Sequence, residues 1–380
     1  MKIGFDAKRL FCNFTGLGNH SRTTIDILSA QFPHAEFYLY SPRIVENDLT
    51  RRFINQGRSH LVMPHDLLRG SLWRTFSIAN EGRRDGIELF HGLSNELPVG
   101  LHGAGIPSVV TIHDVAFRTF PDMYHAHDRF IYDQKWRYAC RNADQIIAIS
   151  ECTKRDIIRY YGVNPDKISV VYQPVAPIYY ENIAEISDEI DKNEVLSDAK
   201  QPYMLYVGSV NSRKNLLSAV KALEMLPADL RIPLVVVGGG GAYKTKVMEY
   251  VSSHHLENLI IWKQVIDNRE LRKIYRRALL FVYPSFYEGF GLPVVEAALS
   301  GCPVITSNVS SLPEAGGPHS LQVDPESVEQ ISHAMQQLIT DRSLHDRLAL
   351  DARDYAMQAF HPSKLACDLM AVYEKCIGGK

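Results

Sequence analysis

The sequence predicts an α/β protein of two doubly wound domains, each with a parallel sheet covered by helices on both faces. Short apolar runs alternate with helical stretches along most of the chain, which is typical of parallel strands joined by helical crossovers. The chain has 380 residues, a length that favours more than one hydrophobic core. The alternation stops once, in residues 176–202, and then restarts.

The first domain is expected over residues 1–175 as a Rossmann-like unit. Its strands are expected at residues 2–6, 36–40, 87–91, 108–113, 145–149 and 168–171, where apolar residues run together between polar turns. Its clearest helices are expected at residues 20–32, 128–142 and 153–161. A loop with two glycines, Gly16 and Gly18, separates the first strand from the first helix.

The interruption at residues 176–202 is expected to be an interdomain linker with an acidic insertion. Few large apolar residues follow Tyr180, and Pro174, Pro177 and Pro202 break regular structure. Its acidic residues are Glu181, Glu185, Asp188, Glu189, Asp191 and Glu194. Such a charge run is more typical of a solvated segment than of a core element.

The second domain is expected over residues 203–358 and is also Rossmann-like. Its strands are expected at residues 203–207, 234–238, 259–262, 279–283, 303–306 and 320–323. A long helix is expected over residues 328–357, and a last one from residue 363 to about 376, after Pro362.

The composition limits the classes of protein that need to be considered. The net charge of -2 argues against nucleic acid as the main partner. No stretch is apolar over the length of a membrane span, and the N-terminus does not read as a signal peptide. The six cysteines form no C-x-x-C pair and are expected to be reduced thiols. We therefore expect a soluble, cytoplasmic protein.

Residues 283–296, Y-P-S-F-Y-E-G-F-G-L-P-V-V-E, predict a strand, a glycine loop and a helix start. Pro293 suits the first turn of that helix because it lacks only an N–H that would be unpaired there. The N–H groups of Phe290, Gly291 and Leu292 would then lie at the positive end of the helix dipole. The pattern predicts an anion site.

Two glutamates, Glu288 and Glu296, flank this loop with seven residues between them. Carboxylates beside an anion site would accept hydrogen bonds from neighbouring hydroxyl groups, as on a sugar or a ribose. The alternative is that Glu296 merely stabilises the helix dipole and that Glu288 is a solvated loop residue.

The segment Gly208 to Leu216, G-S-V-N-S-R-K-N-L, follows the first strand of the second domain. A planar guanidinium, Arg213, beside a compact ammonium, Lys214, suits a diphosphate. An exposed basic pair without a ligand is the alternative. Because both motifs follow strands of the same expected sheet, their ligand groups are expected on the same sheet edge.

Together, the E-x7-E motif around G-F-G-L-P and the G-x4-R-K-N segment resemble the family-4 retaining glycosyltransferases of GT-B fold. The resemblance covers nearly the whole chain. It implies two domains that face each other across a cleft, and a last helix, within residues 359–380, that crosses back to the first domain. It also implies transfer of a hexose from a nucleotide diphosphate sugar to an acceptor hydroxyl, with retention at the anomeric carbon.

The resemblance also assigns roles to residues. Arg213 and Lys214 would stabilise the leaving diphosphate, Glu288 would contact the sugar and Glu296 would hold the ribose. His113, at the end of a strand, would position the donor sugar, although a histidine there is often only structural. The remaining donor contacts implied are Gly16, Gly18, Gly208, Val265, Phe290, Gly291 and Leu292. No D-x-D occurs in the chain, so no metal and no cofactor are expected.

The base of the nucleotide stays open between GDP and UDP. Asp267 follows the strand where the family holds the base, but Asp267 and Glu270 also have the spacing of a helix capping box. The chain has Tyr172-Gln173-Pro174-Val175 where many members have P-N-G-V, which leaves the hinge and the acceptor open. Bacterial relatives build lipopolysaccharide, capsule or other surface polysaccharides, and many use GDP-mannose, so mannose is slightly favoured.

Two other functions are compatible with these motifs. A GT-B relative could epimerise or hydrolyse the nucleotide sugar, and a two-domain protein could bind a sugar phosphate without chemistry. The basic pairs Arg51-Arg52 and Arg83-Arg84 could contact an anionic membrane at which lipid-linked acceptors reside. Apolar residues near them are Leu67, Leu68, Leu72, Trp73 and Phe76. The alternative for this segment is a packed amphipathic helix.

Overall fold

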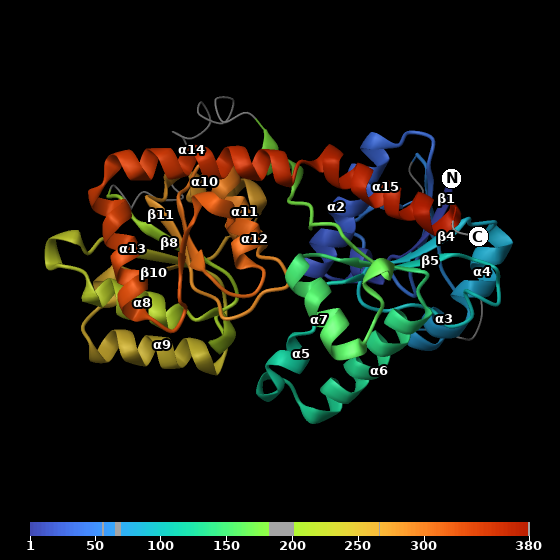
Figure 1. The fold of residues 1–380 in the computed structure, drawn as a ribbon, viewed down its shortest axis with the longest axis horizontal. Helices are drawn as coiled ribbons and strands as arrows, with labels where there is room; N and C mark the ends of the chain where they lie inside the picture. Colours follow the sequence, from blue (N-terminus) through green and yellow to red (C-terminus); the bar gives the residue numbers. More distant parts are fainter. Residues whose placement is uncertain (55–56, 65–69, 182–200, 266, 379–380) are drawn as a thin grey trace. The chain divides into compact units, whose positions relative to one another are not determined.

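A computed structural model describes residues 1–54, 57–64, 70–181, 201–265 and 267–378 (Figure 1). It divides into two compact units, Met1–Pro174 with Pro362–Lys380, and Val175–His361. Both are α/β units with a parallel sheet, as predicted. Most of the acidic insertion expected between the domains, residues 182–200, lies outside the described residues.

The first unit is built on a seven-stranded sheet with the order β3-β2-β1-β4-β5-β6-β7. All neighbouring strands are parallel. The strands are β1 (Lys2–Asp6), β2 (Glu36–Tyr40), β3 (Ser59–Val62), β4 (Leu89–Gly92), β5 (Ser108–Ile112), β6 (Gln145–Ala148) and β7 (Ile168–Val170).

Helices cover both faces of this sheet, because successive side chains of a strand point to opposite faces. Leu89 of β4 belongs to the hydrophobic cluster of one face, and the next residue, Phe90, to that of the other. Val109 and Val110 of β5 divide in the same way. The helices are α1 (Lys8–Cys12), α2 (Gly16–Gln31), α3 (Ser71–Phe76), α4 (Ile78–Asp85), α5 (Ala116–Thr119), α6 (Ala126–Asn142), α7 (Glu151–Tyr161) and α15 (Pro362–Gly378).

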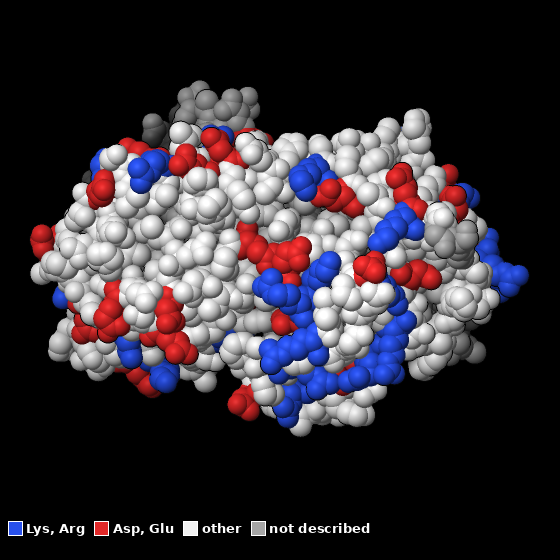
Figure 2. All heavy atoms as spheres, in the orientation of Figure 1, with Lys and Arg blue, Asp and Glu red and all other residues white. Residues whose placement is uncertain are grey.

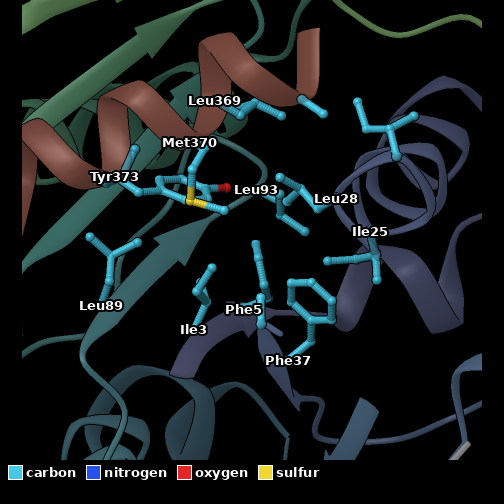
Figure 3. Close-up of a cluster of buried hydrophobic side chains, with 14 of the residues drawn as sticks. Ile3, Phe5, Ile25, Leu28, Phe37, Leu89, Leu93, Leu369, Met370 and Tyr373 are labelled. Atoms are coloured by element: carbon cyan, nitrogen blue, oxygen red, sulfur yellow. The ribbon is translucent and has the colours of Figure 1, made fainter. Parts of the chain in front are cut away.

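The last helix, α15, packs into the core of the first unit although it is the end of the chain. Its buried residues Leu369, Met370 and Tyr373 approach Leu28 of α2 and the sheet (Figure 3). The hydroxyl of Tyr373 lies 2.7 Å from Nδ1 of His91, which is fully buried on β4. A helix that buries one apolar stripe in this way is part of the unit's core.

The second unit has a six-stranded parallel sheet with the order β10-β9-β8-β11-β12-β13. The strands are β8 (Met204–Val207), β9 (Leu234–Val237), β10 (Ile260–Lys263), β11 (Leu280–Tyr283), β12 (Val304–Ser307) and β13 (Leu321–Val323). The helices are α8 (Leu216–Met225), α9 (Ala242–Ser253), α10 (Asn268–Arg277), α11 (Leu292–Leu299), α12 (Leu312–Gly316), α13 (Val328–Thr340) and α14 (Arg342–Ala359).

The structure differs from the expected elements at residues 328–357 and at β3. The single helix expected over residues 328–357 is two helices, because Asp341 is extended and its carboxylate accepts a hydrogen bond from the N–H of Leu344 at 2.9 Å. Strand β3 was not expected; it is a short edge strand of mixed exposure without a clear alternation. Among the described residues, no helix is both long and apolar enough to cross a membrane.

Candidate functional site

Two loops at the carboxyl edge of the second sheet bring the predicted diphosphate and sugar residues together. A single helical turn, Ser212–Lys214, follows β8, and residues 284–291 follow the neighbouring strand β11. The amide of Asn215 joins the two loops, since Nδ2 donates to the carbonyl oxygen of Pro284 at 3.0 Å. Nδ2 also donates to the carbonyl oxygen of Pro325, just after β13, at 2.8 Å. Strand order reverses between β8 and β11, which is where doubly wound sheets bind ligands.

Glu288 lies between the two predicted diphosphate ligands. Its Oε2 is 3.2 Å from Nη1 of Arg213, and its Oε1 is 3.2 Å from Nζ of Lys214. Oε1 also accepts hydrogen bonds from the hydroxyls of Tyr283 at 2.8 Å and Ser285 at 3.1 Å. The three charged side chains are 12 to 16% exposed. The structure therefore brings Arg213, Lys214 and Glu288 into one largely buried charge cluster.

The cluster keeps Glu288 ionised. Burial acts to raise the pKa of Glu288, but the charges of Lys214 and Arg213 outweigh it and lower the pKa to about 2. Lys214 is further held by its hydrogen bond to the hydroxyl of Tyr283, at 2.6 Å. In this state Glu288 is the counterion of the basic pair. Its expected contact with sugar hydroxyls stays a prediction.

The glycine loop between Glu288 and helix α11 is tightly constrained. Gly291 has a φ of 115°, and a Cβ there would lie 2.9 Å from Leu312 and 3.2 Å from Ala315. Phe290 is 2% exposed and packs edge-on against Phe360, with 5.2 Å between the ring centroids. Leu292 begins α11, and the carbonyl oxygen of Gly291 accepts a hydrogen bond from the N–H of Val294 at 2.9 Å. The predicted use of this loop as an anion site stays a prediction.

Glu296 of α11 lies in an aromatic environment. Tyr275 donates a hydrogen bond to its Oε2 at 3.2 Å, and burial raises the pKa of Glu296 to about 7. Burial and the charge of Glu296 together raise the pKa values of Tyr179 and Tyr180. The buried hydroxyl of Tyr179 has no hydrogen-bond partner in the described part of the chain. Sequence reasoning missed both tyrosines because they come from the segment just after the first domain.

The backbone segments that follow β8 and β9 lie close together, and a glycine stands in each of them. Gly208 has a φ of 153°, and a Cβ on Gly238 would lie 1.9 Å from the carbonyl oxygen of Gly208. Gly238 opens the run Gly238-Gly239-Gly240-Gly241, which was given no role from the sequence. Four consecutive glycines after a strand were an available signal for this close contact.

The loop after β10 contains the residues considered for the nucleotide base. Val265 is half-buried, and its predicted contact with the base stays a prediction. The carboxylate of Asp267 accepts a hydrogen bond from the N–H of Glu270 at 2.8 Å and begins α10. This is the helix cap that the sequence left open, so Asp267 gives no information about the base.

In the first unit, the two predicted glycines differ in their surroundings. A Cβ on Gly18 would lie 1.7 Å from the carbonyl oxygen of Asn13, whereas a Cβ on Gly16 would meet nothing within 4 Å. The side chain of Asn13 accepts a hydrogen bond from the N–H of Gly18 at 3.0 Å. Helix α2 consequently begins at Gly16 and not at His20 as expected.

His113 is 4% exposed just after β5, and both of its ring nitrogens have protein partners. Nε2 lies 2.8 Å from the carbonyl oxygen of Leu93, and Nδ1 lies 2.8 Å from Nε2 of Gln173. The first contact requires the proton on Nε2, so that Nδ1 accepts from the amide of Gln173. Burial lowers the pKa of His113 to about 4. The histidine is neutral, and its role toward a donor sugar stays a prediction.

His20 is a polar residue of this region that sequence reasoning missed. Its ring meets that of His113 edge-on, with 4.6 Å between the centroids, and is 6% exposed. Neither of its buried ring nitrogens has a hydrogen-bond partner in the described part of the chain. Its position on α2 resembles an ordinary core position, so no pattern distinguished it.

The two halves of the chain match two family models. The model of glycosyl transferases group 1 matches residues 187–355, and that of Glycosyltransferase Family 4 matches residues 22–177.

Individual proteins match as well. The O-antigen chain mannosyltransferase B of Escherichia coli is 31% identical over 357 residues, which are 90% of this chain and 91% of that protein. The serotype-specific mannosyltransferase WbdA of Escherichia coli is 28% identical over 282 residues, 70% of this chain but 33% of WbdA. The crystal structure of Anabaena HepE in complex with UDP has a TM-score of 0.74 at 16% identity, covering 99% of this chain and 100% of that chain. The last comparison concerns the fold alone, which is GT-B.

Proposed function

Because this chain belongs to the group 1 and family 4 glycosyltransferases, we propose that it transfers a hexose from a nucleoside diphosphate sugar to a hydroxyl of a glycan or a lipid-linked glycan. The observation that carries the proposal is the cluster of Arg213, Lys214 and Glu288 beside the glycine loop. Two cations and the start of a helix fit a diphosphate, and carboxylates fit the hydroxyls on either side of it.

The donor would be a GDP- or UDP-linked hexose, with mannose favoured. Mannose is supported by the Escherichia coli relatives, which are named as mannosyltransferases. A nucleotide diphosphate is supported by the fold shared with HepE, whose structure contains UDP. The name of the first of these relatives, an O-antigen chain mannosyltransferase, supports an acceptor in O-antigen or another surface polysaccharide. A lipid-linked acceptor would bring the enzyme to the inner face of the cytoplasmic membrane.

In the proposed reaction, the bond between the anomeric carbon and the β-phosphate oxygen breaks, and a bond to the acceptor oxygen forms on the same face. Arg213, Lys214 and the N–H groups of the loop at Gly291 would stabilise the negative charge that develops on the diphosphate. The acceptor proton would pass to the leaving phosphate. Glu288 would offset positive charge at the sugar ring, and Glu296 would accept hydrogen bonds from the ribose.

We propose that neither a metal nor a cofactor is needed, since two cationic side chains are placed to supply the charge that a divalent ion would otherwise supply. Arg213 also donates a hydrogen bond to the carbonyl oxygen of Tyr287, and Lys214 to the hydroxyl of Tyr283. Both cations are therefore preorganised on the sheet edge.

The test is transfer by the purified protein in the presence of EDTA, with GDP-mannose, UDP-glucose and UDP-N-acetylglucosamine as donors and polysaccharide fragments as acceptors. We expect one donor to be consumed only when acceptor is present, and an anomeric configuration unchanged in the product by NMR. Arg213→Ala and Lys214→Ala should each lower turnover by about a hundredfold or more. Lys221→Ala, on α8, is the matched control and should leave turnover unchanged.

Three outcomes would contradict the proposal. Full turnover by both variants would remove the diphosphate role of the basic pair. A product formed without acceptor would indicate an epimerase or a hydrolase. Tight binding of a nucleotide sugar that stays intact with every acceptor would indicate a binding protein.

A further inference from the structure

A buried histidine of the first unit lacks the partners that its ring requires. His20, in the second turn of α2, is 6% exposed. Both of its ring nitrogens are buried and have no hydrogen-bond partner among the described residues. An unpaired buried polar group destabilises a folded protein, and such groups are rare in native structures. The partner of His20 is therefore expected outside the chain itself.

The neighbouring histidine, His113, is in the opposite state. Its Nε2 lies 2.8 Å from the carbonyl oxygen of Leu93, and its Nδ1 lies 2.8 Å from Nε2 of Gln173. Its ring meets that of His20 edge-on, with 4.6 Å between the centroids. A substrate could bond the ring of His113 only by displacing one of these partners, whereas His20 has both nitrogens to offer.

A second unpaired group lies close to the same pair of rings. The hydroxyl of Ser94 is buried and has no hydrogen-bond partner among the described residues. Ser94 directly follows Leu93, whose carbonyl oxygen accepts the hydrogen bond from His113. Both unpaired side chains thus adjoin His113, His20 through its ring and Ser94 through the backbone.

The position of these residues in the sheet favours a ligand site. Helix α2 follows β1, after α1, and Ser94 follows β4, which pairs with β1. Strand order reverses between these two strands, and doubly wound sheets bind ligands at such a reversal. Thr15, Gly16 and Asn19, which precede His20, are exposed. The ring therefore lies just below the surface at the carboxyl edge of the sheet.

The chemistry of the ring favours an uncharged hydroxyl group. Burial, together with His113 and His91, lowers the pKa of His20 well below its usual value. The neutral ring has one N–H donor and one acceptor nitrogen, and a hydroxyl group both donates and accepts. A phosphate would need cations. Figure 2 shows Lys and Arg side chains of the first unit gathered over α5, α6 and α7, whereas the ring of His20 meets another neutral histidine.

We infer that His20 binds a sugar hydroxyl in the first unit, with Ser94 as a second contact. The inference rests on the proposed function, which brings two sugars to the enzyme, the donor hexose and the acceptor glycan. Both present hydroxyl groups, and the experiment distinguishes them. The direct contact is thereby assigned to His20, while His113, held by Leu93 and Gln173, supports the ring of His20 from the side.

The apolar segment of the first unit that was noted from the sequence does not compete for this role. Leu67 and Leu68 lie outside the described residues, and Trp73 is only 3% exposed, since it packs into the core. Leu72 and Phe76 of α3 are exposed, but neither side chain can donate or accept a hydrogen bond. A sugar hydroxyl needs polar partners, which His20 and Ser94 provide.

The experiment is steady-state transfer by the full chain, with GDP-mannose and a mannose oligosaccharide varied in turn. His20→Phe keeps an aromatic ring against His113 but removes both nitrogens, whereas His20→Gln keeps a donor and an acceptor. We expect His20→Phe to lower kcat/KM about tenfold, the worth of one or two hydrogen bonds, and His20→Gln to lower it less. A raised KM for the oligosaccharide assigns the contact to the acceptor, and a raised KM for GDP-mannose assigns it to the donor.

Thermal unfolding distinguishes a binding role from a structural one. Because His20→Phe removes an unpaired buried polar group without opening a cavity, its midpoint should be unchanged or higher by about 2 °C. A residue that only supports the fold would show a lower midpoint. The matched control is His60→Phe, on β3, where the ring is half-exposed and packs on Tyr38. It should leave kcat/KM unchanged.

Nuclear magnetic resonance measures the contact without transfer. The ring nitrogen signals of His20 are assigned by their loss in His20→Phe. We expect these signals to shift on addition of GDP-mannose or of the mannose oligosaccharide, and to stay unchanged with GDP alone, which carries no hexose.

Three results would overturn the inference. The first is an unchanged kcat/KM in His20→Phe. The second is a lower midpoint with equal losses of activity in His20→Phe and His20→Gln, which would make His20 a structural residue. The third is the absence of a shift with either sugar, or a full shift with GDP alone. The proposed transfer is judged separately, because a shift of His20 in a protein that transfers no sugar would support the inference and contradict the transfer.

Discussion

Glu288 pairs with the same two cations that the proposed reaction needs for the diphosphate of the substrate. Its carboxylate pairs with Arg213 and Lys214, each at 3.2 Å, so an incoming diphosphate must share both cations with a fixed negative charge. Such a charge weakens the binding of the nucleotide before transfer and also of the product after it. The same carboxylate would stabilise positive charge at the sugar only in the transition state, where stabilisation accelerates the reaction.

We expect Glu288→Gln to separate these effects. The amide removes the charge with little change in size, so GDP or UDP should bind about tenfold more tightly, since two ion pairs of low exposure are released. Turnover should fall in the same variant by about a hundredfold. Isothermal titration and initial rates measure the two quantities. Weaker nucleotide binding by Glu288→Gln would mean that the carboxylate supports the site and does not compete with the ligand.

Glu296 predicts a pH dependence. Burial raises its pKa from 4.5 to about 7, so the carboxylate takes up a proton as the pH falls below 7. If the ribose hydroxyls donate to the ionised form, nucleotide affinity should fall by up to about tenfold from pH 8 to pH 6. Calorimetric titration at several pH values tests this. Glu296→Gln should bind more weakly at pH 8 and show a flat profile; a profile as steep as that of the unchanged protein would assign the titration to another group.

At the scale of the element, the glycine loop before α11 depends on two separate constraints at Gly291. Its φ of 115° disfavours any side chain, and a Cβ would also lie 2.9 Å from Leu312. Gly301, just beyond the C-terminus of α11, has a φ of 75°, but a Cβ on Gly301 would meet nothing within 4 Å. A substitution at Gly301 therefore measures backbone strain alone, whereas one at Gly291 measures strain together with a steric collision.

We expect Gly301→Ala to lower the free energy of unfolding by about 1 kcal/mol, the cost of a left-handed conformation, and to leave nucleotide affinity unchanged. Gly291→Ala should cost about 1 to 3 kcal/mol more, because Leu312 or the loop must move, and should also weaken nucleotide binding. Urea denaturation and calorimetric titration measure both. Equal effects of the two substitutions would show that the collision at Leu312 is relieved without moving the loop.

The elements of the fold were predictable where local chemistry decided them. The apolar run that ends at Tyr283, the two glycines and Pro293 specify a strand, a loop and a helix start without reference to the rest of the chain. Asp341 was missed because an aspartate within a long apolar pattern is also tolerated on a helix surface, and only its extended backbone makes it a cap. Strand β3 was missed because its pairing with β2, and not its own pattern, makes it a strand.

At the scale of the molecule, part of the candidate site was predictable because its motifs follow strand ends. Arg213, Lys214 and Glu288 come from two motifs with a fixed relation to strand ends, so the parallel sheet itself brings them together. The tyrosines around Glu296 and the contact of His20 with His113 depend on tertiary packing between distant segments. No local pattern contains that information, and only the folded chain reveals it.

Helix α15 belongs to the first unit. A substitution in α15 can therefore distinguish the stability of the first unit from that of the second. Tyr373, 0% exposed, joins the end of the chain to His91 on the central sheet. Tyr373→Phe leaves Nδ1 of a buried histidine without its partner, at a cost of about 1 to 3 kcal/mol. Because Tyr373 and His91 both belong to the first unit, we expect this substitution to destabilise that unit while the nucleotide affinity of the second unit stays unchanged.

A matched substitution exists in the second unit. The hydroxyl of Tyr355 on α14 donates to the carbonyl oxygen of Glu314 at 2.8 Å, and Tyr355→Phe removes one hydrogen bond there. Thermal unfolding is measured with and without GDP. Tyr355→Phe should lower the midpoint of the second unit's transition, and GDP should raise the midpoint of that same transition, because a ligand stabilises only the unit that binds it. The transition lowered by Tyr373→Phe should not respond to GDP. A single transition, lowered by both substitutions and raised by GDP in each variant, would mean that the two units unfold as one and that α15 couples them.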